Sequence, residues 1–117
     1  KILSKTSHLP HVISFALMHF LEKELGEKVF KYSGGSLESY TRIASSDPLM
    51  WKDVTVSNKE AVLEAIKGFK SSLNEVSKLI DSEDEESILD FLSFVKEVRD
   101  KQLFSDGTSW KASEEDS

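Results

Sequence analysis

The sequence of 117 residues contains no cysteine, only two prolines and only five glycines. The absence of cysteine excludes disulfides, thiolate metal ligands and thiol nucleophiles. It also suits a reducing compartment, so we expect a cytoplasmic protein. The scarcity of proline and glycine, together with long helical periods, predicts an all-α domain.

Positive charge is also scarce. The net charge is −6, and Lys and Arg form no cluster. Because nucleic-acid binding needs grouped cations to neutralise phosphates, we expect no nucleic-acid partner. The one apolar stretch, residues 9–21, is too short to cross a bilayer, so we also expect no membrane span.

Periodicity and capping residues predict the first three helices. A first helix, apolar nearly all round, is expected from about residue 7 to residue 25, ended by Gly26. A connector over residues 26–36 closes with a glycine pair, which permits positive φ or a close backbone approach. A short helix over residues 37–44 follows, and Ser46-Asp47-Pro48 supplies a cap and a first-turn proline for the next helix.

Two longer helices are then predicted, each after a segment with capping-box spacing, Ser57-Asn58-Lys59-Glu60 and Ser82-Glu83-Asp84-Glu85. After the first box, apolar residues recur at alternating steps of four and three: Val62, Ile66, Phe69, Leu73, Val76 and Ile80. This heptad-like seam predicts lengthwise packing against another helix. We expect a helical domain over residues 1–104 and a disordered acidic tail over residues 105–117.

Polar side chains form a stripe on the otherwise apolar first helix. Ser7, His11 and Ser14 fall on one face at helical spacing. An unpaired buried polar group costs about 1–3 kcal/mol, so these groups need partners. The partners are either backbone and neighbouring helices or a ligand, and the residues alone leave both possibilities open.

Other candidate groups are equally ambiguous from the residues alone. A histidine metal site is a lesser alternative, because His8 and His11 lie one turn apart but His19 lies over two turns further on. Arg42 either pairs with an acid or clamps a carboxylate with its planar fork. Trp51 is either core or the wall of a binding site. No phosphate-binding glycine motif and no catalytic triad is present.

The same segments resemble the dimer-forming, C-terminal helical domain of prephenate dehydrogenases. The resemblance covers about residues 4–100 and rests on an ordered set of motifs: Ser7-His8-Leu9-Pro10-His11, Gly34-Gly35, Tyr40-Thr41-Arg42-Ile43-Ala44, Ser46-Asp47-Pro48-Leu49-Met50-Trp51 and Asn58. It implies a helical bundle like the C-terminal domain of 6-phosphogluconate dehydrogenase, interlocked as a two-fold homodimer. It also implies a parent enzyme that converts prephenate to 4-hydroxyphenylpyruvate with NAD or NADP, in tyrosine biosynthesis. The arogenate dehydrogenases share this architecture.

The resemblance also implies roles for individual residues. Arg42 would bind a substrate carboxylate, and His11 would hydrogen-bond the substrate with Ser7 beside it. Trp51 would line the ring pocket, and Ser46 would touch the substrate or the feedback inhibitor tyrosine. The cofactor loop and the proton-accepting histidine would belong to an N-terminal dinucleotide-binding domain absent from this chain. We therefore expect the chain alone to be inactive, with no catalytic, cofactor or metal residue of its own.

Two positions depart from the family pattern. Ser39 stands where an acid is common three residues before the arginine, so any ion pair would be missing or would pass to Glu38. Ser36 stands where a third glycine is usual. The alternative function is a non-enzymatic helical interaction module. It predicts that His11 and Arg42 lie apart, whereas an enzyme domain predicts that they converge on one cavity.

Overall fold

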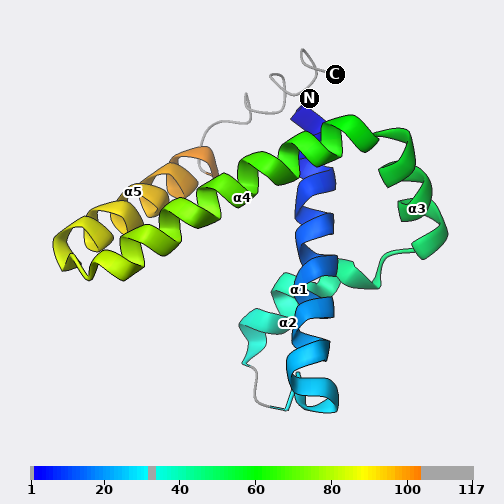
Figure 1. The fold of residues 1–117 in the computed structure, drawn as a ribbon, viewed down its shortest axis with the longest axis horizontal. Helices are drawn as coiled ribbons and strands as arrows, with labels where there is room; N and C mark the ends of the chain where they lie inside the picture. Colours follow the sequence, from blue (N-terminus) through cyan, green and yellow to red (C-terminus); the bar gives the residue numbers. More distant parts are fainter. Residues whose placement is uncertain (1, 32–33, 104–117) are drawn as a thin grey trace. The chain divides into compact units, whose positions relative to one another are not determined.

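The computed structural model describes residues 2–31 and 34–103, and all the regular structure in them is helical (Figure 1). The elements are a π-helical turn Ser4–His8, α1 Leu9–Leu25, a 3-10 turn Gly26–Lys28, α2 Gly35–Thr41, a 3-10 turn Arg42–Ser45, α3 Pro48–Ser57, α4 Lys59–Ser82 and α5 Glu85–Leu103. The all-α prediction is confirmed. None of the described helices is long and apolar enough to cross a membrane. The tail predicted over residues 105–117 lies outside the described residues.

The chain divides into two compact units, residues 3–65 and, among the described residues, residue 2 with 66–103. In the first unit, α1 packs against α2 and against the 3-10 turn that follows it (Figure 1). The buried apolar side chains of the described residues are few: Val29, Trp51, Val62 and Ala65. The first unit, which contains all four, therefore has a thin core.

The first helical segment begins earlier than predicted and widens just before Pro10. Residues 2 and 3 are already helical, and in the π-helical turn the Leu9 N–H donates to the carbonyl of Ser4. Proline has no N–H, and its ring displaces the carbonyl four residues earlier in a regular helix. The wider turn therefore carries the helix past Pro10 without the bond that proline cannot make.

The glycines play unequal parts. Gly26 ends α1 with φ 60° and ψ −136°, a conformation that only glycine adopts at little cost, so the predicted helix end is confirmed. The Gly34-Gly35 pair is different. Gly34 has φ −90°, and a Cβ added at either glycine would meet nothing within 4 Å. The two reasons predicted for this pair, positive φ and a close backbone approach, are not met within the described chain.

The cap of α3 is where the Ser46-Asp47-Pro48 pattern indicates. Asp47 is the capping residue, because its side chain accepts a hydrogen bond from the Leu49 N–H at 3.2 Å. Pro48 occupies the first helical position, where its missing N–H costs nothing.

The cap of α4 lies one residue beyond the predicted one. α3 extends through Ser57, so Asn58 stands between the helices. Its carbonyl accepts from the Val62 N–H at 2.9 Å, while its side-chain amide donates back to the carbonyl of Val54 at 2.8 Å. Asn58 thus joins the end of α3 to the start of α4.

The cap of α5 lies two residues beyond the predicted one. Ser82 is still the last residue of α4, and Glu83 then takes a left-handed backbone with φ 57°. Asp84 caps α5, accepting from the Ser87 N–H at 3.2 Å and from the Ser87 hydroxyl at 2.8 Å. α4 thus includes the first residue of the predicted box, Ser82, and the aspartate two residues later is the cap.

Much apolar surface is exposed within one copy of the chain. An α1 that is apolar nearly all round would be expected to be buried on every side, but Ser14 is its only buried residue. The α4 seam is only partly covered, since Val62 is buried whereas Ile80 is 62% exposed, and no residue of α5 is buried. In the described residues, the helices of one copy therefore do not cover the predicted seam along its whole length.

Candidate functional site

An aromatic cluster joins α1 to α3. The imidazole of His11 stacks on the indole of Trp51, with ring centroids 3.9 Å apart and an angle of 18° between the planes. Phe15 and His8 each meet Trp51 edge-on, with centroids 6.0 Å away. Trp51 is 8% exposed. The cluster brings together two histidines that lie one helical turn apart with a tryptophan from 40 residues further along.

The hydrogen bonds of the polar stripe involve the backbone. Nδ1 of His11 lies 2.9 Å from the carbonyl of Ser7, and the Ser14 hydroxyl donates to the carbonyl of Tyr40 at 3.1 Å. Since a carbonyl only accepts, Nδ1 of His11 carries the hydrogen, and Nε2 of the neutral ring is left as an acceptor. Of the two kinds of partner that the sequence left open, backbone or ligand, His11 and Ser14 therefore have the backbone. The other ring nitrogen of His11, Nε2, takes no part in these bonds and is left for a ligand.

His8 differs from His11, because its Nδ1 atom is buried and has no hydrogen-bond partner in the described part of the chain. A shared metal ion is not indicated as its partner. Among residues 2–31 and 34–103, no three His, Asp or Glu side chains come together as a metal site would require.

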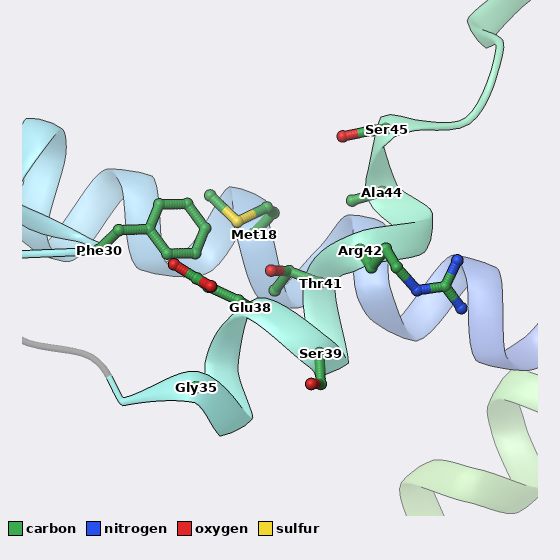
Figure 2. A pocket seen from close by; sticks show the side chains of 9 residues that line it. All are labelled: Met18, Phe30, Gly35, Glu38, Ser39, Thr41, Arg42, Ala44 and Ser45. Atoms are coloured by element: carbon green, nitrogen blue, oxygen red, sulfur yellow. The ribbon is translucent and has the colours of Figure 1, made fainter.

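A first cavity, of about 710 Å³, lies between α1, α2 and the 3-10 turn after it (Figure 2). It is lined by Met18, Phe30, Gly35, Glu38, Ser39, Thr41, Arg42, Ala44 and Ser45. Figure 2 shows the carboxylate of Glu38 directed toward Phe30 and the guanidinium of Arg42 directed the opposite way. Both side chains are exposed, and neither forms an ion pair among the described residues.

The missing ion pair has a backbone cause. A glutamate four residues before an arginine is well placed to pair with it on a regular α-helix. Here α2 ends at Thr41, whose φ of −103° and ψ of 0° start a 3-10 turn at Arg42. The tighter turn changes the direction of Arg42, so Glu38 and Arg42 lie in the same cavity wall but point apart.

A second cavity, of about 320 Å³, adjoins the aromatic cluster. It is lined by Phe15, Ala44, Ser46, Pro48, Trp51, Lys52 and Thr55. The Ser46 hydroxyl donates to the carbonyl of Ile43, and the Lys52 ammonium pairs with the neighbouring Asp53 at 3.1 Å. Ala44 lines both cavities, so the 3-10 turn separates them.

The structure therefore brings some of the predicted site residues together and separates others. His11 contacts Trp51, Ser7 holds His11 through its carbonyl, and Ser46 shares the second cavity with Trp51. Arg42 lines the first cavity, which His11 does not line. In the described residues of one copy, His11 and Arg42 do not converge on a common cavity.

Several cavity residues were missed by the sequence reasoning. Phe15 and Met18 lie four residues after His11 and Ser14, respectively, so they lie on the same face of α1 as these two polar residues. The helical period could have found them. Phe30 lies in the connector between helices, where no periodicity applies, and nothing in the sequence pattern marks it.

Comparison with known proteins identifies the family. Residues 1–94 match the family described as "Prephenate dehydrogenase, dimerization domain". The chain belongs to this family. The resemblance noted in the sequence is thereby confirmed, and so is the corresponding assignment of the helical fold.

Relatives of the prephenate dehydrogenase family are similar over most of the chain. The cyclohexadienyl dehydrogenase of Zymomonas mobilis is 33% identical over 101 residues, which are 84% of this chain and 34% of that protein. The prephenate dehydrogenase of Bacillus subtilis is 29% identical, over 85% of this chain and 27% of that protein. This chain therefore spans about a third of the length of such relatives.

A solved structure of the family is also similar. The prephenate dehydrogenase of Aquifex aeolicus, in complex with hydroxyphenyl propionate and NAD+, superposes with a TM-score of 0.79 and 44% identity. The similarity covers 86% of this chain and 36% of that one.

Proposed function

We propose that this chain is the dimerisation and substrate-binding domain of a prephenate dehydrogenase. The family match over residues 1–94 carries the proposal. The parent enzyme would convert prephenate to 4-hydroxyphenylpyruvate on the route to tyrosine. The ring carboxylate would leave as carbon dioxide, and NAD, when bound, would accept the hydride from C4.

NAD contacts are not assigned to this chain. Dinucleotides are commonly held by a glycine-rich loop between a strand and a helix. The described residues contain no strand, so no such unit exists in them. Relatives about three times as long leave room for a nucleotide-binding domain, and NAD in the Aquifex aeolicus complex favours NAD over NADP.

The residues of this chain would bind and orient the substrate. Arg42 is exposed and free of ion pairs among the described residues, so its planar fork can take a carboxylate without breaking an internal bond. His11, held through Nδ1 by the Ser7 carbonyl, would offer Nε2 to the substrate. Trp51 would form an aromatic wall, and Ser46 would offer its hydroxyl oxygen to the substrate or to tyrosine.

A homodimer is part of the same proposal. Large apolar side chains on α1, α4 and α5 are exposed in one copy, which an isolated domain of this size rarely tolerates. An interlocked two-fold dimer would cover them, and it would let His11 and Arg42 approach one substrate from different subunits or from across a domain boundary.

Steady-state kinetics of the full-length enzyme test the proposal. Arg42→Lys keeps the charge but loses the bidentate fork, so the KM for prephenate should rise about tenfold or more. Arg99→Lys is the matched control, because Arg99 is exposed on α5 and lines neither cavity. An unchanged KM in Arg42→Lys would contradict the substrate-binding role.

A further inference from the structure

The last turn of α2 is held from α1 by a buried serine. Ser14 is 2% exposed, and its hydroxyl donates to the carbonyl of Tyr40 at 3.1 Å. Tyr40 is the second-to-last residue of α2 and lies two positions before Arg42. The hydrogen bond therefore fixes the backbone close to the residue to which the proposed function gives a substrate carboxylate.

The Tyr40 carbonyl lies where α-helical hydrogen bonding stops. In a continued α-helix it would accept from the N–H four residues later, on Ala44. The chain instead forms a 3-10 turn over Arg42–Ser45, in which N–H groups bond three residues back. Carbonyls in the last turn of a helix need partners from outside it, and the Ser14 hydroxyl is such a partner. The bond to Ser14 thus favours ending α2 at this point over continuing it.

The point at which α2 ends sets the direction of the Arg42 side chain. Successive residues turn by about 100° in an α-helix and by about 120° in a 3-10 helix, so a displaced helix end changes where the guanidinium points. Ser14 lines neither cavity, so it can affect a ligand there only through the backbone. An apolar side chain would fill the same space without fixing a direction, because a hydrogen bond is directional and apolar contact is not.

We propose that Ser14 is a positioning residue, which holds the end of α2 so that the guanidinium of Arg42 is directed for binding. This inference rests on the proposed function, because it requires that Arg42 binds a substrate carboxylate. A guanidinium binds a carboxylate through two parallel hydrogen bonds, so its direction matters as much as its distance. A small displacement of such a group weakens binding even when its cause lies away from the substrate. Ser14 thus contributes to substrate binding without touching the substrate.

Steady-state kinetics of the full-length enzyme test the proposal. Ser14→Ala should raise the KM for prephenate about threefold to fivefold, which corresponds to about one hydrogen bond. It should leave kcat unchanged, because binding rather than the chemical step is affected. Ser82→Ala is the matched control and should leave KM unchanged. The Ser82 hydroxyl also donates to a carbonyl at the end of a helix, that of Leu79 in α4 at 2.6 Å, but Ser82 lines neither cavity.

A double-mutant cycle with Arg42→Ala separates positioning from a general loosening of the fold. The quantity compared is kcat/KM for prephenate, which stays measurable when the substrate no longer saturates the enzyme. Arg42→Ala removes the group on which Ser14 is proposed to act, so Ser14→Ala should cause no further loss in that background. Losses that multiply in the double variant would mean that Ser14 acts independently of Arg42, and they would overturn the inference.

The outcomes also separate this inference from the proposed function. If Arg42→Ala lowers kcat/KM but Ser14→Ala leaves KM unchanged, the positioning role is wrong and the carboxylate-binding role stands. Equal increases of KM in Ser14→Ala and Ser82→Ala lead to the same conclusion, because Ser82 is not connected to Arg42. If Arg42→Ala has no effect, the substrate-binding role of Arg42 is wrong and the positioning role fails with it.

Discussion

The imidazole of His11 lies against the indole of Trp51, with centroids 3.9 Å apart and nearly parallel planes. This contact links α1 to α3 of the first unit through two residues that are 40 positions apart in the chain. Trp51 is also one of few buried apolar side chains among the described residues. One residue therefore serves both the core and the wall of a candidate site, which makes its removal informative.

We expect Trp51→Ala to lower the free energy of unfolding by about 3–5 kcal/mol, because it removes a large buried ring and leaves His11 without its stacking partner. Urea denaturation followed by circular dichroism would measure the loss. Met50→Ala is the control, since Met50 precedes Trp51 on α3 and is 55% exposed. Similar losses in the two variants would contradict a central role for Trp51.

Ser14 provides a second, smaller test of how α1 is held. Its side chain is buried, and its hydroxyl donates to the Tyr40 carbonyl near the end of α2. Ser14→Ala leaves that carbonyl without its donor, so unfolding should become easier by about 1 kcal/mol. Ser36→Ala, at an exposed position of α2, should change stability far less. Equal effects would mean that the bond to Tyr40 contributes nothing.

The sequence was sufficient to predict helices but not to place every helix end. The period of apolar residues predicted the all-α fold and the long α4, because helical spacing is a local property. The caps at Asn58 and Asp84 lie one and two residues past the predicted boxes. Several adjacent residues there can cap a helix, and packing decides which one does.

The candidate site was predictable only in part, for the same reason. Ser7, His11 and Ser14 could be assigned to one face of a helix, but the stacking of His11 on Trp51 joins residues that no local pattern connects. The direction of Arg42 depends on the 3-10 turn, and no sequence pattern around Thr41 predicts that turn. Contacts between distant segments are a property of packing, which a single sequence does not display.

Acid should weaken the start of α5 through Asp84. Hydrogen bonds from the Ser87 hydroxyl, then from the Ser87 and Glu86 N–H groups, lower the pKa of this carboxyl below its ordinary value of 3.8. The ionised cap therefore stabilises the folded chain above that pH, and its contribution is lost as the pH falls through the lower folded value. Asp84→Asn cannot lose a charge, so its stability should depend less on pH.

Thermal unfolding of wild type and Asp84→Asn between about pH 5 and pH 2 would measure this difference. The wild-type melting temperature should exceed that of the variant near pH 5, and the gap should narrow toward pH 2. Asp90→Asn, an exposed substitution on the same helix, should show no such narrowing gap. A gap that stays constant across the range would mean that ionised Asp84 is not what stabilises the cap.

The exposed apolar face of α5 tests the proposed homodimer. Phe94 is 65% exposed in one copy, and no residue of α5 is buried. If a second copy covers this face, Phe94→Glu loses about 1.5–3 kcal/mol of burial at each copy and places a charge in the interface. Because Phe94 is exposed in the monomer, the substitution should leave the helix content of each chain intact.

Sedimentation velocity would show the difference as a shift from dimer to monomer at a given concentration. Ser93→Glu is the matched control, because it adds the same charge at the adjacent exposed position of α5 and removes no apolar side chain. It should leave the dimer largely intact, so that a shift confined to Phe94→Glu assigns the association to the apolar contact rather than to net charge. A wild-type chain that sediments as a monomer would contradict the homodimer, and a dimer unaffected by Phe94→Glu would place the interface on the other exposed apolar residues of α1 and α4.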